Sequence, residues 1–167
     1  MRGIKIVELT LVEVISCIQN SRKHFLKHLN GLTADQWDWK PYAECKSIRE
    51  TISHLMGDDL AALESLQSGI EPDYTVAESK AAEMASDNTT ELLKQLADTH
   101  TTLCDALRSQ CADSPLDASI CVWGHDAKIA TGIPYYSSED YYHSGQVAFI
   151  RMATDPTWDY YTSVDGG

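Results

Sequence analysis

Four stretches of this sequence carry an apolar residue at every third or fourth position. They cover residues 4–29, 47–68, 89–111 and 137–153. This spacing places the apolar side chains on one face of an α-helix. Such a face is not stable in water, so the four helices must bury their apolar stripes against one another. The sequence therefore predicts an all-α four-helix bundle.

Residues that start and stop helices stand at the ends of these stretches. Gly31 and Gly69 follow the first and second stretches, and Pro156 follows the fourth. Glycine and proline at such positions are ordinary helix terminators. Ser47 and Glu50 form the S-x-x-E pattern of a capping box, in which each residue satisfies a free backbone N–H group at the helix start. We therefore expect the second helix to start at Ser47.

The connections between the predicted helices are long, so a simple up-down-up-down connectivity is not forced. A short helix around Val76–Met84 is expected in the second connection. In the third, residues 112–136, the strand-like segments SICVW and KIATG flank a turn-like GHDA, which indicates either an irregular segment or a small hairpin. The 167 residues are too few for two ordinary domains, so we expect a single domain over residues 1–167.

The composition argues against several classes of protein. The net charge is -12, and no basic stripe appears that could neutralise the phosphates of a nucleic acid. No uncharged apolar run approaches the ~20 residues that a membrane span needs. The five cysteines form neither a C-x-x-C pair nor a disulfide framework. We therefore expect a cytoplasmic protein with reduced thiols, whose partners include neither a nucleic acid nor a membrane.

A carboxylate and an imidazole lie four residues apart near the start of the fourth helix. Glu139 and His143 share a helix face with the apolar Val147 and Ile150, so this face is expected to point inward. Residues four apart on a helix can reach one ion. Carboxylate and neutral imidazole are ligands of zinc, nickel and iron(II). His54, at the margin of the second helix's apolar stripe, is the best candidate for a third ligand.

Ordinary structural roles are also open to these residues. Glu139 lies in the first turn of its helix, where the helix dipole favours any carboxylate. His143 is compatible with a hydrogen-bonded core histidine. The spacing alone does not decide between a metal site and these roles. The remaining histidines outside the helix cores, His24, His28 and His125, are expected at the surface.

Other polar residues fall on or beside the apolar stripes. Asp58 lies one helical turn after His54, on the same edge of the second helix. Arg22 is compatible either with a side chain that extends along apolar surface to reach water or with a group that contacts an anion in a cavity. His100 is compatible with a buried, hydrogen-bonded histidine or with a substrate-facing one. Asp59 falls at the centre of its stripe, which indicates either a polar interior cavity or a local rotation of the helix.

Two segments resemble the DinB-like (damage-inducible) family. LNGLTADQWDWKPYAECKSIRETISHLMGDD, residues 29–59, is similar to the family's W-x-P motif followed by S-I-x-E-x-x-x-H-L. EDYYHSGQVAFIRM, residues 139–152, resembles the closing motif H-x-x-x-H-x-G-Q-[IV], with Glu139 in place of the first histidine. The order and spacing of the predicted helices fit the family over nearly the whole chain.

The resemblance implies a four-helix bundle that holds a divalent metal with three histidines, one from the second helix and two from the fourth. His54 matches the first ligand and His143 the third, whereas Glu139 occupies the middle position. Two histidines and a carboxylate are a ligand set that zinc and non-haem iron(II) accept. The replacement is also compatible with a site that has decayed.

The resemblance further implies a set of candidate functions. Some relatives transfer low-molecular-weight thiols, such as bacillithiol or mycothiol, to electrophiles. The leading expectation is therefore a metal-dependent thiol transferase with a small-molecule substrate, to which Arg22, Asp58 and His100 would contribute. A metal-dependent hydrolase and a non-catalytic, stress-related bundle with a vestigial site are the alternatives. By analogy with the family we expect a homodimer, with the aromatic residues of DPTWDYYTS, residues 155–163, as an interface patch.

Overall fold

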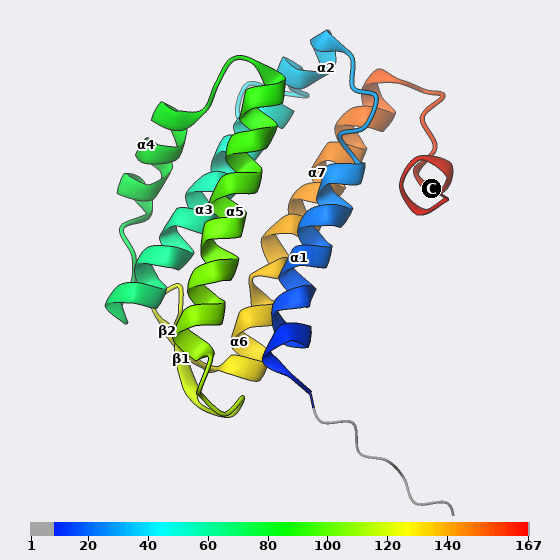
Figure 1. Cartoon of the computed structure of the whole chain (residues 1–167). Coiled ribbons are helices and arrows are strands. Elements are labelled where there is room, and N and C mark those ends of the chain that lie inside the picture. Colours follow the sequence, from blue (N-terminus) through cyan, green and yellow to red (C-terminus); the bar gives the residue numbers. More distant parts are fainter. Residues whose placement is uncertain (1–8, 167) are drawn as a thin grey trace, which may run out of the picture.

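The computed structural model describes residues 9–166, and four long helices lie side by side in it (Figure 1). These helices are α1 (Leu11–Lys27), α3 (Ile48–Ser68), α5 (Thr89–Cys111) and α7 (Ser137–Thr154). The shorter elements are α2 (Ala34–Asp38), α4 (Tyr74–Met84), β1 (Ser119–Val122), β2 (His125–Lys128), α6 (Ile129–Tyr135) and the π-helical turn η1 (Tyr161–Asp165). The prediction of an all-α four-helix bundle is confirmed. No helix among residues 9–166 is long and apolar enough to cross a membrane.

The first helix starts later than its apolar periodicity predicts. Thr10 is not helical, and its side chain accepts a hydrogen bond from the backbone N–H group of Glu13. In return, the Glu13 carboxylate accepts one from the Thr10 backbone N–H group at 2.8 Å. This capping box starts α1 at Leu11, so the predicted helical conformation of residues 9–10 is wrong. The predicted residues 4–8 lie outside the described part of the chain.

The second long helix begins and ends where the sequence predicts. Ser47 and Glu50 form a complete capping box at the start of α3, with both reciprocal hydrogen bonds present. Gly69 ends the helix in the left-handed conformation, at a φ of 73° that favours glycine. These two signals set the bounds of α3, the helix that carries His54 and Asp58.

The buried apolar side chains form two clusters that are separated along the bundle by a polar layer. Ile18 and Leu103 belong to the cluster nearer the hairpin, and Phe25 and Ile52 belong to the cluster at the other end. Between the two clusters, each long helix contributes polar residues to the interior. The buried ones are Ser21 and Arg22 of α1, Asp59 of α3, Thr99 and His100 of α5, and Asp140 and His143 of α7. Asp58 of α3 and Glu139 of α7 lie half-buried beside them.

A small hairpin lies between α5 and α7, but its turn differs from the predicted one. The pairing of Val122 with His125 makes Trp123 and Gly124 the turn, with φ values of 48° and 86°. Two central residues with positive φ are typical of the type I′ turns that favour hairpins. His125 and the three residues after it therefore form the second strand, not the turn. The segment KIATG mostly belongs to α6, a helix that the sequence analysis did not predict.

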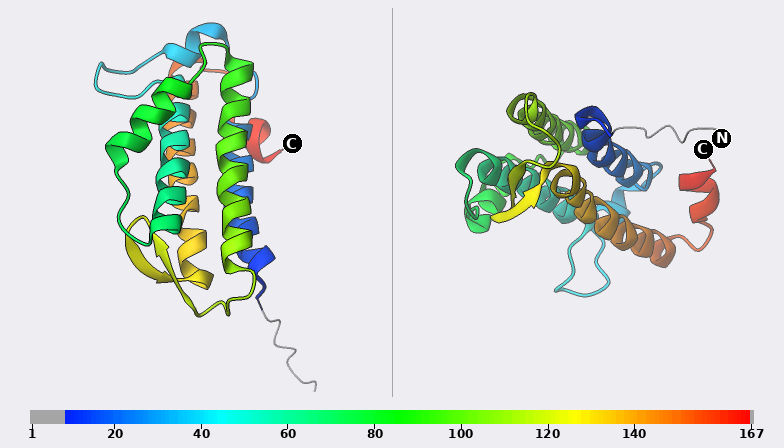
Figure 2. Two further views of the ribbon diagram at one scale, coloured as in Figure 1. Left: turned by 60° about the vertical axis from the view of Figure 1, so that its left-hand side comes forward. Right: turned by 90° about the horizontal axis from the view of Figure 1, so that it is seen from below.

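The C-terminal segment lies beside α1 (Figure 2) and also contacts Arg151 of α7. Trp158 lies over the guanidinium of Arg151, whose Cζ atom is 5.3 Å from the ring centroid. The ring centroid of Tyr160 is 5.6 Å from that of His28. His28 is only 2% exposed, so its predicted surface position is wrong. Part of the predicted interface patch is thus covered by its own chain, whereas Tyr161 remains exposed.

Candidate metal centre

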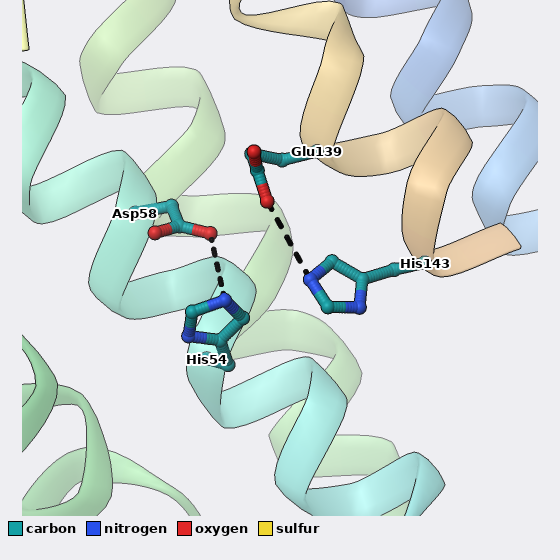
Figure 3. A group of neighbouring side chains, drawn as sticks. All are labelled: His54, Asp58, Glu139 and His143. Atoms are coloured by element: carbon teal, nitrogen blue, oxygen red, sulfur yellow. Dashed lines mark ion pairs between the residues drawn. The ribbon is translucent and has the colours of Figure 1, made fainter. Parts of the chain in front are cut away.

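Four potential metal ligands converge between α3 and α7 (Figure 3). His54 and Asp58 come from α3, and Glu139 and His143 come from α7. One ligand atom from each residue can be chosen such that all four atoms lie within 4.8 Å of one another. Each pair is spaced four residues apart, which places its two side chains one above the other on the same helix face. The structure therefore brings the three predicted ligands together and adds Asp58 to them.

The His143 side chain is held with one ring nitrogen directed at the cluster. Its Nδ1 atom lies 2.7 Å from Oε1 of Gln146. Because an amide oxygen accepts hydrogen bonds, this contact places the proton on Nδ1 and leaves the lone pair on Nε2. The Nε2 atom is buried without a hydrogen-bond partner, and lies 3.6 Å from Oε2 of Glu139. A nitrogen held in this way is suited to bind a metal.

His54 has contacts on both ring nitrogens. Its Nδ1 atom lies 3.2 Å from Oε1 of Glu78, which α4 supplies from outside the bundle. Its Nε2 atom lies 3.4 Å from Oδ2 of Asp58. The centroid of its ring is 5.0 Å from that of His143, and the two rings are nearly perpendicular. A carboxylate on the far nitrogen is the usual way to orient a metal-binding histidine.

The electrostatics of the cluster favour a cation. Burial and the negative charge of Glu139 together raise the pKa of Asp58 to about 7. Burial also lowers the pKa of His54, and the charges of Lys46 and His143 act in the same direction. The imidazole of His143 lowers the pKa of Glu139. Since Oδ2 of Asp58 is buried without a hydrogen-bond partner, these residues fit a divalent metal ion, which would satisfy both carboxylates and the free imidazole nitrogen.

The cluster faces a cavity of about 630 Å³. One wall is the loop from Pro41 to Lys46, and the other is the outer face of α7 from Tyr142 to Ile150. His54, Glu139 and His143 line its polar end. A cavity of this size is in the range of small-molecule binding sites. The candidate metal centre is therefore accessible to a small ligand.

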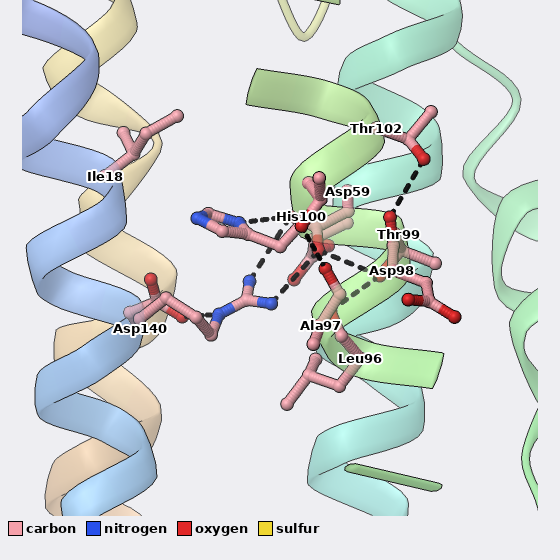
Figure 4. A network of polar contacts seen from close by, with 12 residues as sticks. Ile18, Asp59, Leu96, Ala97, Asp98, Thr99, His100, Thr102 and Asp140 are labelled. Atoms are coloured by element: carbon pink, nitrogen blue, oxygen red, sulfur yellow. Dashed lines mark hydrogen bonds and ion pairs between the residues drawn. The ribbon is translucent and has the colours of Figure 1, made fainter. Parts of the chain in front are cut away.

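A network of buried ions (Figure 4) includes Asp59 and Asp140, the residues that directly follow Asp58 and Glu139 of the cluster. The Arg22 Nε atom donates to Asp140 at 2.6 Å, and its two terminal nitrogens donate to Asp59 at 3.1 and 3.2 Å. Burial opposes the charge of Arg22, but the two carboxylates outweigh this effect and raise its pKa. Arg22 is 6% exposed, so it does not extend to water. Asp59 lies in a polar interior. Its position in the apolar stripe is therefore explained by this interior and not by a local rotation of the helix.

His100 belongs to the same network. Its Nδ1 atom lies 3.4 Å from Oδ1 of Asp59, and Thr99 donates a hydrogen bond to the other oxygen of that carboxylate. Burial opposes protonation of His100, but its contact with Asp59 outweighs burial and raises the pKa to about 9. Neither Arg22 nor His100 lines the large cavity. The lining of the cavity therefore does not support their predicted role as substrate contacts.

Two further residues of the site, Asp58 and Gln146, could be recognised from their spacing in the sequence. Asp58 follows His54 by one helical turn and was considered only as a contributor to catalysis. Gln146 follows His143 by three residues, within reach on the same helix face. Glu78 had no such signal, because its contact with His54 depends on how α4 packs against α3.

A model of the DinB superfamily matches residues 18–136 of this chain. The matched part includes His54 and Asp58 and ends just before α7, so Glu139 and His143 lie outside it. No curated protein and no solved structure matches the chain.

Proposed function

Because this chain belongs to the DinB superfamily, we propose that it is a divalent-metal-dependent enzyme that transfers a low-molecular-weight thiol to an electrophile. The observation that carries the proposal is the convergence of four donor atoms beside an open cavity. Two of the cluster's polar atoms, Nε2 of His143 and Oδ2 of Asp58, are buried without a hydrogen-bond partner. Leaving such groups unsatisfied costs free energy, which a bound cation would recover.

His54, Glu139 and His143 are the proposed metal ligands, and Asp58 is positioned to be a fourth. Nitrogen and carboxylate donors suit zinc, nickel and iron(II). A bound divalent ion would lower the pKa of a coordinated thiol or water and so supply a nucleophile near neutral pH. Gln146 and Glu78 keep the two imidazoles oriented toward the cluster. The cavity between the loop at residues 41–46 and α7 gives the thiol and the electrophile room beside these ligands.

A metal-dependent hydrolase is the second candidate. In it, three residues would hold the ion and Asp58 would remain free to accept a proton from water. This candidate is favoured by the position of Asp58, whose Oδ2 atom faces the cluster without a hydrogen-bond partner. The third possibility, a non-catalytic bundle with a vestigial site, requires that the four residues bind no metal.

An assay of both reactions separates these candidates. Bound metal is removed from the protein with a chelator, and zinc, nickel or iron(II) is then added back. Thiol transfer is measured with a panel of small thiols and chlorodinitrobenzene as the model electrophile. Hydrolysis is measured with nitrophenyl acetate as the model ester. The proposal expects metal-dependent loss of thiol that the His143→Ala variant lacks. Metal-dependent ester cleavage without thiol consumption would favour the hydrolase, and no metal-dependent reaction of either kind would favour the vestigial site.

We also propose a homodimer, on the family resemblance. Light scattering over the micromolar range tests the assembly. A mass of two chains is expected, and a mass of one chain at every concentration would contradict this part of the proposal.

A further inference from the structure

The large cavity has a polar end and an apolar body. His54, Glu139 and His143 form the polar end, and Pro41, Tyr142 and Phe149 contribute apolar surface, with the Tyr142 ring centroid 5.0 Å from that of His143. Tyr142 and Phe149 are 63% and 50% exposed, although both are large and apolar. Exposed aromatic side chains that line a cavity beside polar groups are typical of a ligand site. The body of a bound molecule would therefore be aromatic or otherwise apolar.

Lys46 supplies the cavity with a positive charge. Among the described residues that line the cavity, it is the one lysine, and no arginine accompanies it. Within residues 9–166 its ammonium group forms no ion pair or hydrogen bond, whereas that of Lys40, six residues earlier, lies 2.6 Å from Glu50. A cation without a protein partner is available to a ligand.

Lys46 is exposed, whereas the buried cations near the cluster are already paired. Arg22 donates to Asp59 and Asp140, and His100 contacts Asp59. Two carboxylates, Glu44 and Glu139, also line the cavity and would oppose a second negative charge on the ligand. The lining thus provides for one anionic group and not for several.

From this arrangement, and resting on the proposed function for the reaction itself, we infer that the cavity binds a small monoanion with an aromatic or apolar body. Lys46 holds its carboxylate or sulfonate group, and the side chains of Tyr142 and Phe149 contact its body. Lys46 is in this account a specificity-determining residue, because it selects anionic over uncharged molecules of the same shape.

A pair of matched fluorescent probes tests the inference. Anilinonaphthalene sulfonate carries an aromatic body and one negative charge, and N-phenylnaphthylamine is nearly the same molecule without the charge. Their dissociation constants are measured for the wild type, Lys46→Gln and Lys23→Gln. Lys23 is an exposed residue of α1 outside the cavity, so the control removes the same charge elsewhere. The protein is used both with added zinc and after chelator treatment, so that failure of metal binding does not affect the outcome.

The inference expects Lys46→Gln to weaken binding of the sulfonate by about fivefold, as for a solvent-accessible ion pair, and to leave the uncharged probe unchanged. Lys23→Gln should change neither. The difference should shrink in high salt. Equal sulfonate binding by wild type and Lys46→Gln would overturn the inference, as would an equal loss of both probes, which would indicate a rearranged loop.

Cysteine labelling locates the bound probe. Cys45 lines the cavity, whereas Cys17 is exposed on α1 and does not. Bound sulfonate should slow the alkylation of Cys45 by iodoacetamide and leave that of Cys17 unchanged, as read by mass spectrometry of the two peptides. Unprotected Cys45 at saturating probe would place the probe outside the cavity and refute the assignment.

Discussion

The imidazole rings of His54 and His143 lie 5.0 Å apart, measured between their centroids, although they come from different long helices of the bundle. Each ring has a carboxylate one helical turn away on its own helix, Asp58 for His54 and Glu139 for His143. This symmetrical arrangement of two i, i+4 pairs is the basis of the proposed metal centre.

Replacement of His143 by alanine should remove most of the bound metal. The substitution deletes the buried Nε2 atom that has no other partner. The fold should survive, with a loss of unfolding free energy of about 1 kcal/mol, because two apolar clusters stabilise the bundle independently of the site. Metal analysis and urea unfolding check the two parts. His125→Ala, at an exposed position on the hairpin, is the control; equal metal content in both variants would count against the site.

Glu139→His restores the three-histidine pattern that the DinB-like resemblance implies. It should retain or tighten metal binding, because the imidazole would occupy the same turn of α7 and remain within reach of His54 and His143. Competition with a chromophoric chelator measures the affinity. A loss of binding would contradict this prediction and show that the site requires a carboxylate at this position.

Asp58→Asn separates metal binding from stability. The variant should bind metal about 10-fold or more weakly, as expected when a ligand or its immediate neighbour is lost. Without metal it should unfold at a higher temperature than the wild type, because the buried carboxylate of Asp58 is close to that of Glu139. Thermal unfolding in the presence of a chelator gives this comparison. Lower stability of the metal-free variant would mean that the two carboxylates do not repel each other in the fold.

The buried ion network should be far more important for stability than a surface pair. Arg22→Met leaves Asp140 buried without a cation and Asp59 with His100 alone, which should cost about 3–5 kcal/mol of unfolding free energy. Arg108→Met removes an exposed pair with Asp105 and should cost no more than about 1 kcal/mol. Urea unfolding of the two variants tests the difference. Similar costs would show that the network is not desolvated in solution.

The same network predicts a dependence of stability on pH. The pKa of His100 is raised from 6.5 to about 9 by Asp59, against the opposing effects of burial and Arg22. A base whose pKa is higher in the folded state stabilises the fold fully below pH 6.5 and loses this contribution as the pH rises through about 9. The contribution is at most about 3 kcal/mol, from 1.36 kcal/mol per pKa unit. His100→Gln should unfold with a flatter pH dependence over this range, and an unchanged slope would contradict the assignment.

The apolar periodicity of the sequence predicted the four long helices, because burial of one face is a property that each segment carries by itself. The caps at Ser47 and Gly69 placed α3 to the residue. The start of α1 was misplaced because the apolar periodicity continues before Thr10. Only the capping box of Thr10 and Glu13 marks the N-terminus of the helix. The hairpin turn was misplaced because Trp123 adopts a positive φ that is uncommon for its residue type.

The candidate site was predictable where it depends on spacing within a helix and not where it depends on packing between helices. The four-residue interval from Glu139 to His143 and the resemblance together identified the α7 half. The roles of Arg22 and His100 were not predictable, because both depend on Asp59 and Asp140, which reach them from other helices. The role of Lys46 was not predictable from the sequence, because only its position in the cavity lining distinguishes it from other exposed lysines.

We infer that His54, Asp58, Glu139 and His143 hold a divalent metal ion. Elemental analysis of the protein, purified without an affinity tag and without added metal, tests it most directly. The account predicts about one divalent ion per chain, as for a single site of this ligand type, and loss of most of it in His143→Ala. A wild-type protein that contains no stoichiometric metal and takes up none when zinc, nickel or iron(II) is supplied would contradict it.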